Sequence, residues 1–389
     1  MCQHWGVTDP PNWLPPTNPE RPAMPGGAYG PVSGASAAPA GGPPPGWAPP
    51  PKPGLIPLRP LDFGTLLWAP FQVLRRNPKA TFGSALIVQS AITLLTLVVV
   101  GVVTWIALDR IESAAPAEQE AVEAGSMAAI LLSALVPVAL SVVAGALLQG
   151  VIVVEVARAT LGEKLRLGQL WRAAGRRLWP LVLWAILLST AILVGLAVVV
   201  GGTVLFVALG GAWVGLGVAI GILGGVALIA VSAWLFTRTT LVPSLIVLER
   251  LGIGQAVRRS WALTTGYFWR TLGIQLLVAL IVNVIAQIVT TPLVIVWTIA
   301  ISLVDPNAAF EAWIPSILLY VLILFFTLLI GAVTAVIQSA TTAVIYIDLR
   351  MRKEGLDLEL QRFVESARGD VAADPYLVAP GGRPGVPWA

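Results

Sequence analysis

Between Arg177 and Arg238 the chain runs for sixty residues without a charged side chain. As one helix this segment would reach about 90 Å, roughly three times the hydrocarbon thickness of a bilayer. A water-soluble fold is excluded because soluble domains carry about 25% charged residues, whereas this chain of 389 residues carries 11%. The segment therefore predicts two membrane-spanning helices that turn near Gly210 and Gly211.

Four further apolar runs predict the other spans, at residues 80–108, 127–157, 271–304 and 313–347. The expected fold is all-α, a polytopic membrane protein whose six transmembrane helices form three hairpins within residues 58–350. In the fourth span Gly217, Gly221 and Gly225 recur every four residues. Such spacing favours close helix packing, either within the chain or between copies of it.

The two ends of the chain have a different composition. Residues 1–57 hold 17 of the 31 prolines, so we expect a disordered, Pro/Gly-rich tail there. No basic region is followed by an apolar run, so we expect no signal peptide, and the natural start is expected near Val7. Residues 351–389 are expected to form a helix and a second disordered tail.

The distribution of charge predicts the orientation. The loops at 109–125 and 302–312 hold seven acidic residues and one base, Arg110. The other 23 of the 24 basic residues lie outside these loops and outside the turn near 207–212. Since basic residues stay in the cytoplasm, both termini are expected on the cytoplasmic side of a cell inner membrane.

A basic amphipathic segment precedes each hairpin. In the second of these segments the apolar side chains between Leu167 and Leu178 share one helical face, which predicts a helix lying in the membrane interface. Glu155 precedes Gly162 by seven residues, as Asp348 precedes Gly355. Three parallel repeats, each an interfacial helix and a hairpin, would explain this order. Chance similarity among amphipathic segments is the alternative.

Charged residues at the ends of two spans are candidate sites. Glu155 has Arg158 nearby, and Asp348 has Arg350 and Arg352 nearby. Carboxylates inside membranes are costly and often functional, but near the interface an ion pair satisfies them. We expect interfacial ion pairs, with a proton or ion site as one alternative and an intramembrane enzyme using Glu155 and Asp348 as another.

Polar groups within and beside the spans form two more candidate sets. Amides inside spans either join helices by hydrogen bonds or line a transport pathway. Arginines of the interfacial segments either set topology or hold anionic lipid headgroups. The amide cluster comprises Gln149, Asn283, Gln287 and Gln338, and the lipid-contact set comprises Arg75, Arg76, Arg172, Arg176, Arg177, Arg258, Arg259 and Arg270.

Side chains for catalysis or metal binding are scarce. The single cysteine and the single histidine are Cys2 and His4. A Cys/His metal cluster cannot be assembled from them, and histidine, the commonest general acid and base, is missing from the spans. We therefore expect no enzyme activity, no cofactor and no metal. Nucleic-acid binding is not expected either, because the basic residues form no separate domain.

Two stretches resemble a known family. Residues 238–270 contain Glu249, then Ala256-Val-Arg-Arg-Ser-Trp261, then Gly266-Tyr-Phe-Trp-Arg270, and the last span ends in Tyr346-Ile-Asp-Leu-Arg-Met-Arg-Lys-Glu-Gly355. The chain resembles, over about residues 57–365, the membrane domain associated with glycerophosphoryl diester phosphodiesterases, in its actinobacterial branch with proline-rich tails. The resemblance implies the six-helix fold. It does not carry over the phosphodiesterase activity, which belongs to a separate barrel domain rich in histidine.

The function that follows from these features is not catalytic. We expect a structural, scaffolding or lipid-associated membrane protein whose partners are membrane lipids, including anionic ones, and other membrane proteins. The alternative is a transporter or permease-like component for a lipidic or small hydrophobic substrate. A cavity at mid-membrane lined by Asn283, Gln287 and Gln338 would favour transport, and a groove beside the arginine-rich helices would favour lipid handling.

Overall fold

The computed structural model describes residues 54–175, 177–304, 310–366 and 374–377. Over these residues the regular elements are helices without strands, which confirms the all-α prediction. In chain order they are α1 (Phe63–Arg76), α2 (Pro78–Ser113), α3 (Gln119–Ser133), α4 (Leu135–Thr160), α5 (Leu167–Gly175), α6 (Leu178–Ala208), α7 (Trp213–Thr239), α8 (Val242–Leu248), α9 (Ile253–Thr264), α10 (Phe268–Ser302), α11 (Phe310–Glu354) and α12 (Leu356–Ser366).

Six stretches are long and apolar enough to cross a membrane, and they confirm the predicted spans in length and composition. They are α2, α3 with α4, α6, α7 with α8, α10, and residues 313–354 of α11. The second span is interrupted at Ala134, whose backbone N–H donates to the Leu131 and Leu132 carbonyls. Pro137 explains the interruption because it has no N–H for the carbonyl four residues earlier and its ring crowds that carbonyl.

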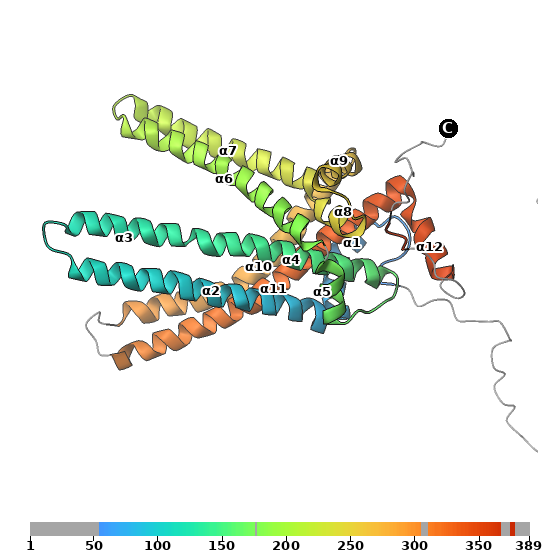
Figure 1. The fold of residues 1–389 in the computed structure, drawn as a ribbon, viewed down its shortest axis with the longest axis horizontal. Helices are drawn as coiled ribbons and strands as arrows, with labels where there is room; N and C mark the ends of the chain where they lie inside the picture. Colours follow the sequence, from blue (N-terminus) through green and yellow to red (C-terminus); the bar gives the residue numbers. More distant parts are fainter. Residues whose placement is uncertain (1–53, 176, 305–309, 367–373, 378–389) are drawn as a thin grey trace, which may run out of the picture. The chain divides into compact units, whose positions relative to one another are not determined.

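The spans pair along the chain, as Figure 1 shows. α2 packs on α3 and α4, α6 packs on α7, and α10 packs on α11. The turn predicted between the third and fourth spans is confirmed, since Gly210 and Gly211 both have positive φ, at 68° and 55°. Side chains at these two positions would be strained, so glycine permits the tight connection.

Two glycines of the fourth span lie against the third. A Cβ at Gly217 would lie 2.8 Å from the Val207 side chain, and one at Gly221 would lie 3.2 Å from the Thr203 hydroxyl. Gly225 has open space, and Gly224 makes the next close approach instead. The spacing of small residues therefore serves packing between α6 and α7 within the chain.

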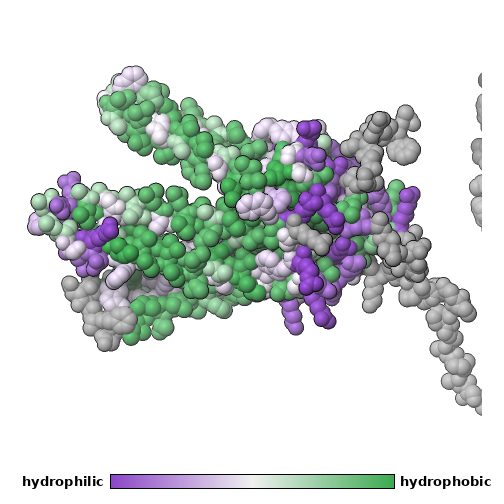
Figure 2. Space-filling view, in the orientation of Figure 1, coloured by the Kyte–Doolittle hydropathy of each residue, from purple (hydrophilic) through white to green (hydrophobic). Residues whose placement is uncertain are grey.

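Shorter helices gather at one end of the spans, which we name the polar end. It consists of α1, α5, α8, α9 and α12 together with the adjoining ends of α4, α7 and α11 (Figure 1). Figure 2 shows hydrophilic residues concentrated here, whereas the long helices present an apolar surface. α1, α5 and α9 directly precede α2, α6 and α10 in the chain, so each hairpin begins behind a shorter helix.

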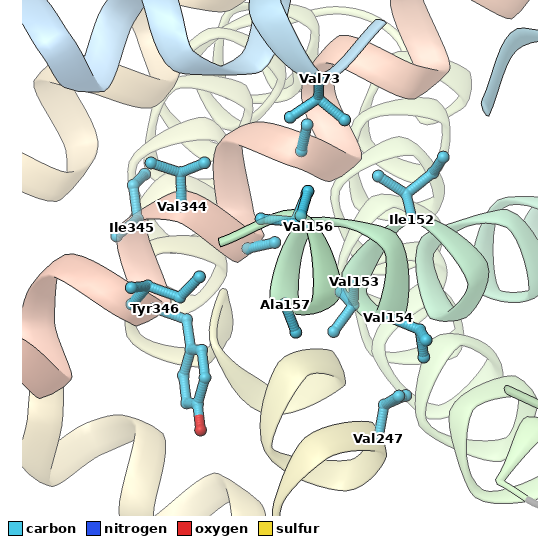
Figure 3. Packing of buried hydrophobic residues seen from close by; sticks show 14 of the residues in the cluster. Val73, Ile152, Val153, Val154, Val156, Ala157, Val247, Val344, Ile345 and Tyr346 are labelled. Atoms are coloured by element: carbon cyan, nitrogen blue, oxygen red, sulfur yellow. The ribbon is translucent and has the colours of Figure 1, made fainter. Parts of the chain in front are cut away.

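The apolar core lies at this polar end. In the most apolar window of each span only 6–17% of the residues are buried. By contrast, the end of α4 around Val153 is buried against Val247 of α8 and the α11 residues around Val344 (Figure 3). The hairpins are therefore joined mainly where they meet the shorter helices.

The predicted tails lie largely outside the described residues, which exclude 1–53, 367–373 and 378–389. Within the stretch predicted as the first tail, Leu55 and Ile56 are buried in the core. The Leu55 backbone N–H donates to the Ala159 carbonyl at 3.0 Å. The reason is the apolar Leu-Ile pair, which interrupts the proline-rich composition and can be buried.

Candidate functional site at the polar end

The polar end contains a network of buried charges. Glu249 follows α8 and Arg350 lies on α11, and their side chains are 0% and 5% exposed. Arg350 Nη1 lies 3.7 Å from Glu249 Oε1 and donates to the Tyr346 hydroxyl at 3.0 Å. Tyr346 in turn donates to Glu249 Oε1 at 2.9 Å. These contacts therefore join the end of α8 to α11, about a hundred residues apart in sequence.

Arg259 of α9 and Glu354 of α11 complete this network. Arg259 Nη2 donates to Glu354 Oε2 at 2.9 Å, and Arg259 Nε lies 2.5 Å from Glu249 Oε2. Glu354 also accepts from Arg350 Nε at 2.8 Å. Two carboxylates thus face two guanidinium groups, and the position of α9 is fixed to both α8 and α11.

The electrostatics of Glu249 follow from its burial. Burial raises the pKa of the Glu249 carboxyl above its ordinary value, and the positive charges of Arg350 and Arg259 oppose that rise. A buried ion pair often adds little net stability, yet removing one partner is costly. We will call the five residues Glu249, Arg259, Tyr346, Arg350 and Glu354 the buried charge network.

Asp348 pairs with Arg352, one of the two arginines that follow it in the sequence. Its carboxylate accepts from Arg352 Nε at 3.0 Å and from the Leu61 N–H at 2.8 Å. Arg270 Nη2 lies 3.7 Å from it and donates to the Leu61 carbonyl at 2.7 Å. The other predicted partner, Arg350, instead joins the buried charge network, because residues two apart on a helix point to different sides.

Glu155 and Arg158 are also not paired with each other among the described residues. Glu155, 1% exposed, accepts from Asn77 Nδ2 at 3.0 Å. Arg158 pairs with Glu163 at 3.6 Å and with Asp374 at 2.9 Å. Glu155 faces the junction of α1 and α2, whereas Arg158 faces the returning end of the chain, so the two charges are used separately.

The four amides are not brought together, since no hydrogen bond within the described residues joins any two of them. Gln149 donates to the Thr342 hydroxyl at 3.4 Å and joins α4 to α11. Asn283 donates to Ala279 of its own helix, and Gln287 accepts from Thr291 of the same helix. Gln338 is exposed on α11. One of the four thus joins two helices.

The predicted lipid-contact arginines separate into groups by exposure. Arg75, Arg172 and Arg258 are exposed, and Arg76 and Arg177 are half-buried. Arg176 lies outside the described residues. Arg259 and Arg270 are engaged in the ion pairs given above, so their charges hold helices in place. The exposed members are the ones whose guanidinium groups can reach a ligand.

A shallow cavity of about 470 Å³ lies along α9. Its lining residues are Gly254, Val257, Arg258, Trp261 and Ala262, which we name the α9 groove. It combines one exposed guanidinium with an aromatic ring and aliphatic side chains. This composition suits a ligand with an anionic group beside an apolar part.

The floor of the α9 groove is attached to α7. Trp234 packs edge-to-face against Trp261, with ring centroids 5.0 Å apart. The Arg238 guanidinium carbon lies 5.3 Å from the Trp261 ring centroid, which is within cation–π range. The Ser260 hydroxyl donates to the Arg238 carbonyl at 2.7 Å. Trp261 is therefore held on its inner side and still 36% exposed on the outer one.

Sequence reasoning missed Glu249, Tyr346 and Arg238 as site residues. Glu249 and Tyr346 belong to the stretches on which the family resemblance rests, but that resemblance assigns them no role. A usable signal was Glu249 itself, the first acid after a run of more than eighty residues without one. The partners could not be named, since they come from separate parts of the chain.

Comparison with known proteins gives no match: no family model, no curated protein and no solved structure is similar to this chain.

Proposed function

We propose that this chain is a non-enzymatic, multi-pass protein of the cytoplasmic membrane that binds anionic lipid headgroups at the α9 groove. Its role would be structural or scaffolding, with α1, α5 and α9 in the membrane interface and both termini in the cytoplasm. The charge asymmetry between the two ends of the spans supports this orientation. The resemblance to the phosphodiesterase-associated membrane domain remains part of the proposal and supplies no activity.

The α9 groove is the observation that carries the proposal. Arg258 and Trp261 are three residues apart on α9 and both line the groove. Three-residue spacing places two side chains on the same helical face. Arg258 can meet a phosphate while Trp261 and Val257 meet the apolar part of the same molecule.

The transporter alternative has less support. It would need the amides of the spans to line a common cavity, but the α9 groove is lined by none of them. Asn283 and Gln287 form their hydrogen bonds within α10. The polar atoms suited to a headgroup lie at the polar end instead.

Lipid binding by the purified protein tests the proposal. The dissociation constant for phosphatidylglycerol and for phosphatidylcholine is measured by native mass spectrometry, for the wild type and for Arg258→Ala. An arginine near a phosphate contributes about 1 kcal/mol, which corresponds to roughly fivefold in affinity. We expect Arg258→Ala to weaken phosphatidylglycerol binding by about that factor and to leave phosphatidylcholine binding unchanged.

Arg172→Ala is the matched control, since Arg172 is also an exposed arginine of a short helix but does not line the groove. If both variants weaken phosphatidylglycerol binding equally, binding follows overall charge and the groove has no special role. If neither changes it, the proposal is wrong.

A further inference from the structure

After α12 the segment Asp374–Leu377 lies at the polar end, and Tyr376 is the most deeply buried residue of this segment. The Tyr376 side chain is 1% exposed and belongs to the apolar core. Its hydroxyl donates to the Ala157 carbonyl at 3.1 Å and shares a hydrogen bond with the Thr160 hydroxyl. The end of α4 thus supplies a closed pocket with two polar partners for a tyrosine ring.

Two arginines beside this pocket hold the segment, one through a side chain and one through the backbone. Arg158 Nη2 donates to Asp374 Oδ2 at 2.9 Å, and Arg350 Nη1 donates to the Tyr376 carbonyl at 3.3 Å. Within the segment the Tyr376 N–H donates to Asp374 Oδ1 at 3.1 Å. This internal bond places the carboxylate and the ring at a fixed spacing, as in other Asx turns.

These contacts have the features of a peptide-recognition site. There is a pocket for one aromatic side chain, a cation for one carboxylate and a donor for one backbone carbonyl. Buried aromatic anchors with hydrogen-bonded polar tips dominate the affinity of such sites. The donors come from α4 and α11, so an occupied site also joins those two helices.

We propose that the ends of α4 and α11 form a docking site for the Asp374–Leu377 segment, and that reversible docking of this segment controls lipid binding at the α9 groove. The second half rests on the proposed function. The occupant is this chain's own segment. Docking of the same segment from a second copy is a separate outcome that the experiment distinguishes.

Arg350 connects the two sites. Its Nη1 contacts the Tyr376 carbonyl and the Tyr346 hydroxyl, and its Nε contacts Glu354. Glu354 accepts from Arg259, which is the neighbour of Arg258 on α9. When the segment leaves, Arg350 loses one of its acceptors and can move, which loosens the carboxylates that fix α9. Since coupling between two sites is reciprocal, bound lipid would favour the docked segment to the same extent.

Distance measurements on the full-length protein in lipid nanodiscs test docking. The single cysteine is removed by Cys2→Ser, and spin labels are attached at Lys164→Cys and Leu377→Cys, both exposed positions. We expect one narrow distance distribution, which Tyr376→Ala broadens. Leu358→Ala, at an exposed position on α12, is the control and should leave the distribution narrow. An unchanged distribution in Tyr376→Ala overturns the docking site.

Two further samples complete this test. Asp374→Asn removes the ion pair with Arg158 but keeps the tyrosine ring, and it replaces Tyr376→Ala if that variant does not fold. We expect a smaller broadening from it. Mixing singly labelled copies detects exchange, and a narrow distance seen only between copies overturns docking within one chain.

Phosphatidylglycerol binding then tests the coupling. We expect Tyr376→Ala to weaken it by about fivefold or more, the lower end of typical coupling between sites. A broadened distance distribution with unchanged lipid affinity overturns the coupling alone. If the wild type binds no phosphatidylglycerol, the proposed function fails and the coupling fails with it, while the distance measurement still decides the docking site.

Discussion

The decrease in the free energy of unfolding when Arg350 is replaced measures how strongly the buried charge network stabilises the fold. Arg350→Met removes the charge and keeps an unbranched apolar side chain in place of the arginine stem. The substitution removes the guanidinium group that lies 3.7 Å from Glu249. It also removes the Nε donor that lies 2.8 Å from Glu354. At an effective dielectric constant of about 20, two charges at the longer distance attract by roughly 4 kcal/mol, of which part is offset by their desolvation.

We expect Arg350→Met to lower the free energy of unfolding by about 3 kcal/mol. Breaking a buried pair costs about 3–5 kcal/mol, and the lower end applies because Arg259 still neutralises Glu249. Unfolding is followed by helical circular dichroism during titration of the purified protein from mild detergent into dodecyl sulfate. The double variant Glu249→Gln, Arg350→Met should be less unstable than the sum of the single changes by about 1–3 kcal/mol, since no uncompensated charge remains.

Glu163→Gln provides the matched control for a surface ion pair. Glu163 lies 3.6 Å from Arg158, nearly the same distance as in the buried pair, but the two side chains are 44% and 30% exposed. Loss of this surface ion pair should lower the free energy of unfolding by less than about 1 kcal/mol. Equal costs for Arg350→Met and Glu163→Gln would refute the reasoning, as would strict additivity in the double variant.

Two further predictions use the same unfolding titration. Because burial raises the pKa of Glu249 in the folded protein, the native state binds more protons than the unfolded state above the ordinary carboxyl value. The free energy of unfolding should therefore fall as pH rises from the ordinary carboxyl value of 4.5 through the raised pKa, and Glu249→Gln should remove this part of the slope. A Cβ at Gly54 would lie 2.0 Å from the Thr160 carbonyl oxygen, so Gly54→Ala should cost about 1–3 kcal/mol. Gly83→Ala, in α2 with open space around it, should instead gain about 0.5–1 kcal/mol, and a loss there equal to that of Gly54→Ala would contradict the steric explanation.

The spans were predictable because apolar length is a local property of the sequence. The uncharged segment between Arg177 and Arg238 forms α6 and α7, and its turn lies at the two glycines that can adopt positive φ. The ends of the spans were predicted less accurately, since α2 extends to Ser113, beyond the predicted limit of 108. A helix continues past its apolar stretch until its last carbonyls find other partners.

The pairing of charges was not predictable, because it depends on contacts between distant parts of the chain. Asp348 and Arg350 are neighbours in sequence, yet one binds Arg352 and Leu61 while the other binds Glu249. Of the two nearby arginines, helical geometry favours Arg352, four residues after Asp348. No local pattern indicates that Glu249 reaches α11, since its partners are set by how α8 and α9 pack there.

The location of the charges explains what selects the arrangement of the hairpins. In lipid, an apolar side chain gains little by exchanging acyl chains for another apolar helix, so span-to-span contacts discriminate weakly between neighbours. The spans here are consistent with this, since 6–17% of their most apolar windows is buried. Buried charges discriminate strongly, because a wrong neighbour leaves a carboxylate or a guanidinium without its partner. Glu249 directly follows α8, whereas Arg259 and Arg350 lie on α9 and α11, so their mutual neutralisation specifies how these three helices meet.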